Sequence, residues 1–486
     1  MNPSNLVFSG LQPARVWAHF ATLCRVPRPS KHEAALRDGL LAWALARRLA
    51  AEVDAAGNLI IRKAATPGRE KSPGVVLQAH LDMVCQKNAD SEHDFSRDPI
   101  VPTVRDGWLV AEKTTLGADN GIGVALVLAV LDSDDIAHGP LEALLTVDEE
   151  AGMGGARGLL PGVLQGRLML NLDTEDWGDF YLGCAGGLDV NVTRDCQAEP
   201  CPGGFEGWHL TLQGLRGGHS GVDIHEERGN AIKLLVRTLH GLVLQFPLRL
   251  AACRGGTARN ALPREAEAIF ALPAGLGGAL ADAVAAWEHA LRDDLSDVED
   301  GLQLRLRPCA VNSVLPVAEQ DVWLSSLHAA PYGVRRMSRR VPGVVETSNN
   351  LGMLDLGPKG GACNFMVRSL VDRRGQALAD EIVSLWALSS TVAVQEGHYP
   401  GWAPNPDSSL LKICQAVYRR DFGAESKVQV IHAGLECGII GAKYPGMDIV
   451  SFGPTIRGAH APGERVEIAS VERCWRLLTA ILAELR

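Results

Sequence analysis

The sequence lacks an apolar run that could cross a membrane. Its longest apolar stretches, such as residues 124–131, fall far short of the ~20 residues that a bilayer span needs. It has no block of Lys or Arg, and 47 basic against 57 acidic residues give a net charge of −10, which argues against a surface that follows nucleic-acid phosphates. Its 11 cysteines include no CxxC pair, as is typical of reduced cytoplasmic thiols. The first residues lack the basic and apolar segments of a secretory signal. These absences predict a cytoplasmic protein that binds neither membranes nor nucleic acid.

The composition that remains is that of a globular protein. The chain has 486 residues, of which 46% are hydrophobic and 21% charged, close to the averages of soluble domains. This length is too great for one ordinary hydrophobic core and predicts two or three domains. An enzyme is the first hypothesis for a protein of this kind.

Strand and helix patterns alternate over residues 1–186. Residues 74–80, 141–147 and 167–172 are short apolar runs, typical of strands that helices cover on both faces. Residues 121–131 carry the unbroken apolar pattern of a buried helix. This order predicts an α/β domain with a largely parallel central sheet flanked by helices.

The pattern changes near Gly187, where alternating strands and amphipathic helices follow one another in an α+β order. That order runs through about twice over residues 187–396, which is enough chain for two ferredoxin-like modules. A segment rich in Pro and Gly then opens residues 397–486, which resume the α/β pattern. We therefore expect an α+β domain at 187–396 to be inserted between the two parts of the first domain, 1–186 and 397–486.

Histidine and carboxylate side chains follow the predicted strands of the first domain, where open α/β sheets bind ligands. His80 and Asp82 are two residues apart on a strand, so both side chains face the same way. The pair fits a metal-bound imidazole with a carboxylate partner, although a structural His–Asp hydrogen bond gives the same pattern. Asp119 lies in a Gly-rich turn before the predicted helix, where it could bridge two cations or cap the helix.

Three successive acids, Asp148, Glu149 and Glu150, end the next apolar strand. They repel one another unless a cation gathers them. Neighbouring side chains diverge, so one could bind a metal while the next addresses a water. A solvated loop is the alternative, but the dense glycines that follow favour a site. Asp173 follows another strand, and His460 lies between the last predicted strand and the final helix.

The combination carries more weight than any one residue. Two imidazoles and three carboxylates lie past predicted strand ends: His80, Asp119, Glu150, Asp173 and His460. Two divalent cations that share one bridging carboxylate need about this set, at a separation of ~3.5–4 Å. Without cations, such crowded carboxylates would be strongly destabilising or would have to protonate. The sequence therefore predicts a two-metal site.

Four motifs around these residues resemble a known family. They are Gln-Ala-His-Leu-Asp-Met-Val, Thr-Leu-Gly-Ala-Asp-Asn-Gly, Gly-Leu-Arg-Gly-Gly-His-Ser-Gly and His-Ala-Gly-Leu-Glu-Cys-Gly, at residues 78–84, 115–121, 214–221 and 432–438. Over essentially its whole length the chain resembles the di-zinc metallopeptidase superfamily that includes aminoacylases, succinyl-diaminopimelate desuccinylase and carnosinases. Within it, the chain is most similar to the cytosolic aminoacyl-histidine dipeptidases, also called peptidase D or Xaa-His dipeptidases.

The resemblance implies a metal-binding role for each member of the set. His80 and Asp173 would hold one divalent ion. Glu150 and His460 would hold the other, and Asp119 would bridge the two. Zinc is the expected metal, with Co²⁺ or Mn²⁺ as alternatives that oxygen-rich sites also accept.

Two further carboxylates would assist the reaction that the resemblance implies. Asp82 would orient His80. Glu149 would be the general base that takes a proton from a water bridging the metals and passes it to the leaving amine. Because the metals polarise the carbonyl and lower the pKa of the water, no Ser or Cys nucleophile is needed. The expected activity is hydrolysis of dipeptides, Xaa-His and β-alanyl-histidine among them.

The resemblance also assigns substrate contacts. The inserted domain would act as a lid, and His219, after a Gly-Gly pair, would stabilise the developing oxyanion. Arg368 is a candidate clamp for the substrate carboxylate, because a guanidinium binds carboxylate through two hydrogen bonds. Asn260 and Glu436 are weaker candidates for contacts with the substrate. Without the resemblance, His219 fits a turn residue and Arg368 a surface arginine.

Several alternatives stay open. A deacylase of N-acyl amino acids or an exo-carboxypeptidase could share this fold and metal site, and so could a non-catalytic metal-binding homologue. The resemblance implies a homodimer through the lid domain, with a small peptide as substrate. Whether His219 serves its own active site or that of a partner is open.

Overall fold

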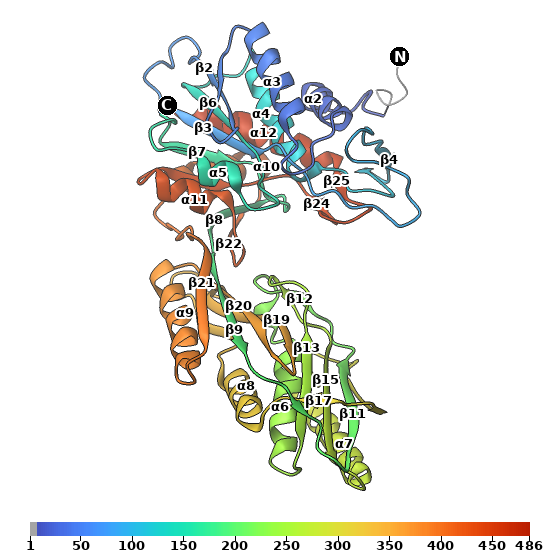
Figure 1. The fold of residues 1–486 in the computed structure, drawn as a ribbon. Coiled ribbons are helices and arrows are strands. Elements are labelled where there is room, and N and C mark those ends of the chain that lie inside the picture. Colours follow the sequence, from blue (N-terminus) through green and yellow to red (C-terminus); the bar gives the residue numbers. More distant parts are fainter. Residues whose placement is uncertain (1–6) are drawn as a thin grey trace. The chain divides into compact units, whose positions relative to one another are not determined.

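The computed structural model describes residues 7–486, which form two compact units (Figure 1). Unit 1 comprises the chain up to Gly183, together with Pro404–Val430 and Leu435–Arg486. Unit 2 comprises Cys184–Ala403 and Ile431–Gly434. None of the helices in the described part of the chain is both long enough and apolar enough to cross a membrane.

Unit 1 is built around an eight-stranded sheet with a parallel centre. The strand order is β1-β2-β6-β3-β7-β23-β8-β22, and the pairs β6–β3, β3–β7 and β7–β23 are parallel. The strands are β1 (Ala50–Val53), β2 (Leu59–Lys63), β3 (Val75–His80), β6 (Leu141–Thr146), β7 (Leu168–Asn171), β8 (Asp179–Cys184), β22 (Lys427–Ile431) and β23 (Asp448–Ser451). The prediction of an α/β fold with a largely parallel sheet is confirmed.

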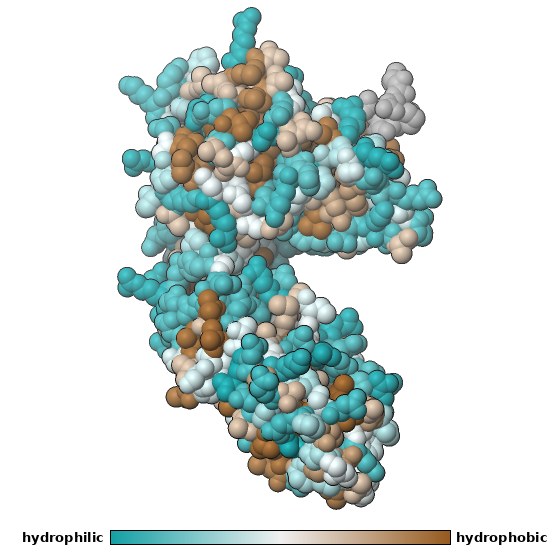
Figure 2. All heavy atoms as spheres, viewed as in Figure 1, coloured by the Kyte–Doolittle hydropathy of each residue, from teal (hydrophilic) through white to brown (hydrophobic). Residues whose placement is uncertain are grey.

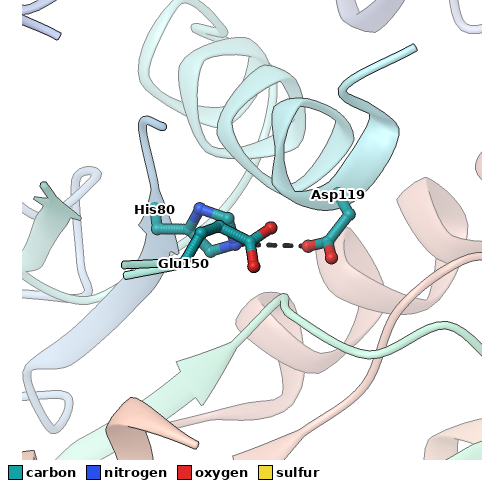
Figure 3. A group of neighbouring side chains, drawn as sticks. All are labelled: His80, Asp119 and Glu150. Carbon is teal, nitrogen blue, oxygen red and sulfur yellow. Dashed lines mark hydrogen bonds and ion pairs between the residues drawn. The ribbon is translucent and has the colours of Figure 1, made fainter. Parts of the chain in front are cut away.

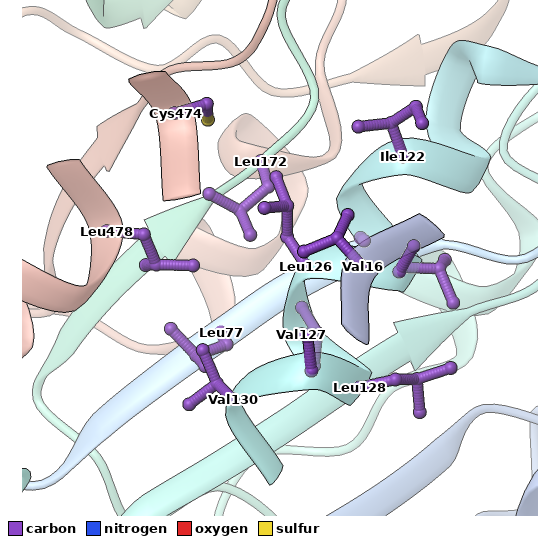
Figure 4. Close-up of a cluster of buried hydrophobic side chains, with 14 of the residues drawn as sticks. Val16, Leu77, Ile122, Leu126, Val127, Leu128, Val130, Leu172, Cys474 and Leu478 are labelled. Atoms are coloured by element: carbon purple, nitrogen blue, oxygen red, sulfur yellow. The ribbon is translucent and has the colours of Figure 1, made fainter. Parts of the chain in front are cut away.

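Helices cover this sheet, and the most deeply buried of them is α4 (Ala118–Leu131). Every residue of α4 except Asp119 is buried, as expected for a helix that is hydrophobic on all sides. Figure 4 shows Leu126 and Val130 of α4 in one apolar cluster with Leu77 of β3 and Leu478 of α12. The helices of unit 1 are α2 (Ala14–Arg25), α3 (Ala34–Ala46), α4, α5 (Gly154–Gly158), α10 (Ser409–Phe422), α11 (Glu436–Lys443) and α12 (Ile468–Glu484).

A small four-stranded sheet completes unit 1. Its strands, in the order β24-β25-β5-β4, are β24 (Ile456–Arg457), β25 (Arg465–Glu467), β5 (Trp108–Val110) and β4 (Thr103–Arg105). The loop from β24 to β25 carries His460, so this second sheet positions a histidine that local pattern alone placed only after the last strand of the central sheet.

Unit 2 contains a nine-stranded sheet in which every pair is antiparallel. Its strands are β9 (Gly186–Asp195), β11 (Phe205–Gln213), β13 (Arg249–Gly255), β15 (Ala266–Pro273), β16 (Gln303–Cys309), β18 (Gly333–Met337), β19 (Val345–Gly357), β20 (Gly360–Ser369) and β21 (Val392–Tyr399). Its helices are α6 (Ala231–Val243), α7 (Gly277–Asp294), α8 (Val317–Ala329) and α9 (Asp372–Ala387). The short pairs are β10 (Glu199–Pro200) with β17 (Ser313–Val314), and β12 (Gly218–His219) with β14 (Ala261–Leu262).

Eight strands of the sheet of unit 2 belong to two βαββαβ modules, one nested in the other, and the ninth, β18, pairs with β19. The first module runs β11-α6-β13-β15-α7-β16, and the second runs β9-α8-β19-β20-α9-β21. Their strand orders, β16-β11-β15-β13 and β21-β9-β20-β19, are the same when each is numbered along its own module. The whole first module is inserted between β9 and α8 of the second. The modules join where Cys253–Gly255 of β13 pair with Leu354–Leu356 of β19.

Candidate metal centre and substrate-binding residues

The side chains proposed as metal ligands all belong to unit 1. Parallel strands bring their carboxyl ends to one edge of a sheet, where ligands bind, and α4 begins at the same place. Among the proposed ligands, His80 lies at the end of β3 and Asp119 at the start of α4. Glu150 and Asp173 lie in the loops after β6 and β7, and His460 lies in the loop between β24 and β25.

Asp119 lies between the two histidines. Its Oδ1 is 3.2 Å from Nε2 of His80, and its Oδ2 is 3.1 Å from Nε2 of His460. Each histidine also faces a second carboxylate: His80 lies 3.4 Å from Oδ1 of Asp173, and His460 lies 3.0 Å from Oε1 of Glu150. Figure 3 shows Asp119 at the start of α4 reaching toward His80 and Glu150. The arrangement is two groups of ligands that share Asp119.

The crowded carboxylates of this cluster favour positive charge beside them. Burial opposes the charged imidazole of His80, but Asp173 and Asp119 outweigh it and raise the His80 pKa well above its ordinary value. Hydrogen bonds with Asp119 and Glu150 raise the pKa of His460 to about 11. The carboxylates thus favour protonated imidazoles, and divalent cations would supply positive charge in their place.

The donor set fits divalent metal ions. Imidazole nitrogen and carboxylate oxygen are the ligands of Zn²⁺ and similar ions in enzymes. Ligand atoms of His80, Asp119 and Glu150 lie within 4.8 Å of one another, which is close enough for one ion. Asp173 and His460 extend the same cluster on either side of Asp119. The cluster is therefore a candidate metal centre.

Asp82 and Glu149 lie beside this cluster. Oδ1 of Asp82 is 3.3 Å from Nδ1 of His80, and the Asp82 side chain is fully buried. The same carboxylate accepts hydrogen bonds from the backbone N–H of Glu149 and Glu150, at 3.0 and 3.1 Å, and from Ser30 Oγ at 2.8 Å. Asp82 therefore lies against the imidazole and binds the backbone of the acidic loop. Burial, with Asp173 and Glu150 nearby, raises the pKa of Glu149 well above its ordinary value.

Glu436 lies at the start of α11 and is fully buried inside unit 1. Its Oε2 accepts hydrogen bonds from Gln78 Nε2 at 2.7 Å and Thr146 Oγ1 at 2.6 Å. Asn171 in turn donates to Gln78. Glu436 thus belongs to a polar chain across the ends of β3, β6 and β7, and burial raises its pKa to about 8.

In unit 2, backbone contacts fix the tautomer of His219. Its Nδ1 accepts hydrogen bonds from the N–H of Gly221 at 3.2 Å and of Val222 at 3.0 Å. The proton of the neutral ring is therefore on Nε2, which is a donor. Burial, aided by the charge of Arg368, lowers the pKa of His219 to about 4, so the ring stays neutral at ordinary pH.

Unit 2 brings Arg368 and Asn260 close to the His219 loop. Asn260 O accepts from Ser220 N at 2.8 Å, and the backbone of Gly221 packs on the Arg368 side chain, where a Cβ would lie 3.1 Å from Arg368 Cδ. The Arg368 guanidinium is buried and donates to the Tyr399 hydroxyl at 2.9 Å. Its positive charge acts on His219, Tyr399 and His432. A buried guanidinium of this kind suits an anionic ligand.

Sequence patterns gave no role to several residues that the structure places at these sites. His432 is buried in unit 2 with its Nε2 2.7 Å from Ser348 Oγ. Arg28 and Glu464 are buried in unit 1 and bind the backbone of the loops that carry the metal-centre residues. The position of Glu464 four residues after His460 was the one feature of the sequence that could have indicated a role at the site.

Comparison with known proteins connects this site to a family. Residues 76–484 match Peptidase family M20/M25/M40. A cytosol non-specific dipeptidase of Escherichia coli is 45% identical over 478 residues, which cover 98% of this chain and 99% of the relative. The crystal structure of aminoacylhistidine dipeptidase from Vibrio alginolyticus superposes with a TM-score of 0.90 at 45% identity, covering 99% of this chain and 98% of that one. A tripeptidase from Staphylococcus aureus, at 17% identity and a TM-score of 0.57 over 98% of this chain and 99% of that one, shares the fold.

Proposed function

The chain belongs to Peptidase family M20/M25/M40, and from this membership we infer that it is a metal-dependent dipeptidase, a hydrolase acting on peptide bonds. The observation that carries the proposal is Asp119, whose two carboxylate oxygens each face a different histidine. The two relatives that are 45% identical to this chain, each over nearly its full length, are named dipeptidases. We propose that His80, Asp173 and Asp119 hold one divalent ion and that His460, Glu150 and Asp119 hold a second.

Glu149 is proposed as the general base. Two divalent ions, when bound, would polarise the scissile carbonyl and lower the pKa of the attacking water. Glu149 would accept a proton from that water and deliver it to the leaving amine. Its burial beside other carboxylates raises its pKa, which suits a group that both takes and returns a proton near neutral pH. Asp82 would hold His80 in one orientation.

His219 and Arg368 are proposed to bind the substrate. The neutral His219 ring carries its proton on Nε2 and can donate to the carbonyl oxygen as negative charge develops there. The buried Arg368 guanidinium can bind the free carboxylate of a dipeptide. Asn260 and Glu436 stay as predicted contacts with the substrate; Asn260 lies next to the strand that pairs with His219, and Glu436 lies inside unit 1.

Substrate preference is the part of the proposal that most needs a test. One relative is named non-specific and the other is named for aminoacyl-histidine; we propose cleavage of Xaa-His dipeptides, including β-alanyl-histidine. Metal-free protein would be loaded with Zn²⁺, Co²⁺ or Mn²⁺ and assayed on β-alanyl-histidine, other dipeptides, tripeptides and N-acetylated amino acids. Hydrolysis of dipeptides with a histidine preference supports the proposal. Faster release from N-acetylated amino acids would make the protein a deacylase instead.

We also propose a homodimer through unit 2 and a cytosolic location. The strand β21 is the edge of the nine-stranded sheet, and its Val392 and Val394 are 59% and 45% exposed. Figure 2 shows hydrophobic atoms gathered over α9 and β21. Exposed apolar edge strands are templates for pairing with another chain. The cytosolic location is supported by the name of the Escherichia coli relative, and sedimentation analysis would test the dimer.

A further inference from the structure

A buried carboxylate binds the loop that leads into α4. Oε2 of Glu464 accepts the backbone N–H of Leu116 at 2.6 Å and of Gly117 at 2.9 Å. Its Oε1 accepts the N–H of Ala118 at 2.7 Å and of Asp119 at 3.2 Å. The residue is 2% exposed, so one carboxylate holds four successive backbone N–H groups out of contact with water.

Such an arrangement stabilises one conformation of the loop. The backbone of Asp119 and Asn120 is non-helical, so these N–H groups lie in a loop ahead of the regular helix and, being buried, need a partner outside it. Hydrogen bonds from backbone N–H to an ionised carboxylate are stronger than neutral ones. Because Glu464 lies four residues after His460, these contacts fix the Asp119 loop to the loop that carries the second histidine.

A buried arginine binds the same loop through a backbone carbonyl. Arg28, also 2% exposed, donates through Nη1 to the carbonyl oxygens of Leu81 and Asp82, both at 2.9 Å, and through Nη2 to that of Gly117 at 2.5 Å. Leu81 and Asp82 directly follow His80. Arg28 therefore connects the Asp119 loop to the loop after β3, as Glu464 connects it to the loop after β24.

We infer that Glu464 and Arg28 are positioning residues for the metal centre. They touch neither His80 nor the carboxylate of Asp119, and they act through the backbone that sets the direction of the Asp119 side chain. Glu464 fixes Asp119 relative to His460, and Arg28 fixes it relative to His80. Their opposite charges act on one another, so neither buried charge is left without a nearby counter-charge. This inference rests on the proposed metal centre and adds what holds its shared carboxylate in place.

The test replaces Glu464 by glutamine. E464Q keeps the shape of the side chain but turns one acceptor into an NH₂ group that faces backbone N–H donors. Metal-free protein is titrated with Co²⁺, and the visible absorption of the bound ion reports affinity and coordination. We expect E464Q to bind Co²⁺ about 10–100-fold more weakly, as partners beyond the ligands commonly contribute, with an altered spectrum. The matched control is E467Q, three residues further on, which removes only a partly exposed ion pair with Arg473 and should leave both readouts unchanged.

A second variant keeps the inference testable if E464Q does not fold. E464D retains the charge on a shorter side chain, and we expect affinity and spectrum between those of E464Q and the parent. Parent-like Co²⁺ affinity and spectrum in either folded variant would overturn the inference. Neither readout depends on peptide hydrolysis. If the variants weaken Co²⁺ binding as expected but the parent protein cleaves no dipeptide, the proposed function is contradicted and the positioning role of Glu464 is not.

Discussion

At the scale of single residues, a substitution of Glu149 tests the general base without removing a proposed metal ligand. Glu149→Gln leaves the five proposed ligands intact, so we expect a folded protein with parental metal content. Loss of the general base should lower kcat by about 10²–10⁴-fold. Turnover of a dipeptide and metal content after gel filtration measure the two effects. Asp148→Asn, at a position with φ of 56° that Asn tolerates, is the neighbouring control and should keep parental turnover. Undiminished kcat in Glu149→Gln would contradict the assignment of the base.

The low pKa of His432 predicts that unit 2 loses stability in acid. Burial lowers its pKa to about 3, and the charge of Arg368 adds to the effect. At low pH the unfolded chain binds a proton at this residue, whose ordinary pKa is about 6.5, and the folded chain does not. Stability should therefore fall as pH drops from about 6.5 toward 3, by on the order of 4 kcal/mol for this residue. The thermal midpoints of parent and His432→Gln between pH 7 and 4 measure it. Parallel curves would show that His432 does not titrate in this way.

The residues of the candidate metal centre could be proposed from the sequence because several of them follow predicted strand ends, although only their combination indicated a site. His80 and Asp82 alternate on one strand, and three acids close the next, so strand ends alone gather them. Arg28 and Glu464 were not predictable, because they bind backbone groups of distant segments and Glu464 is more than 340 residues from its partners. Because nearly every residue has a backbone N–H and C=O group, the residue types do not show which of these groups a distant side chain binds.

At the scale of elements, the start of α4 depends on Gly117. This residue has φ of 69°, which favours glycine, and a Cβ there would lie 2.5 Å from Arg28 Nη2 and 2.7 Å from the Met83 sulfur. Gly117→Ala should therefore destabilise the protein by about 2–4 kcal/mol and weaken metal binding. Denaturant unfolding and metal titration measure the two losses. Gly39→Ala in α3 is the matched control: no atom lies within 4 Å of its Cβ position, and helix propensity should make it neutral or up to about 1 kcal/mol stabilising. Equal effects in the two variants would contradict this role of Gly117.

Helices and strands with a clear hydrophobic period were predicted closely, and those without such a period were not. The predicted helix at 121–131 is present; α4 extends back to Ala118, but the backbone of Asp119 and Asn120 between the two is non-helical. The small sheet of β4, β5, β24 and β25 was not predicted, since its strands have two or three residues each and show no alternation. Which strands pair with one another was harder to predict than the strands themselves. For example, β9 pairs with β20, some 170 residues later, and the local pattern of residues contains no information about such distant partners.

At the scale of the whole molecule, the nested modules explain why unit 2 has one core. The insertion of one βαββαβ module between β9 and α8 leaves β13 and β19 to pair across the junction. Buried residues of both modules then belong to a single apolar cluster, from Leu210 of β11 to Trp386 of α9. We therefore expect unit 2 to unfold as one body in spite of its two modules.

Removal of metal should act on unit 1 alone. All the side chains proposed as ligands belong to unit 1, as do Arg28 and Glu464. A ligand that binds only the folded state stabilises it by RT ln(1 + [L]/Kd), or about 4 kcal/mol at 1,000 times Kd. Differential scanning calorimetry with and without a chelator should show one transition that moves to lower temperature and one, from unit 2, that does not. His80→Ala should remove the metal-dependent shift and leave the unit 2 transition where it is. If the chelator moves both transitions equally, stabilisation by metal is not confined to the unit that carries these side chains.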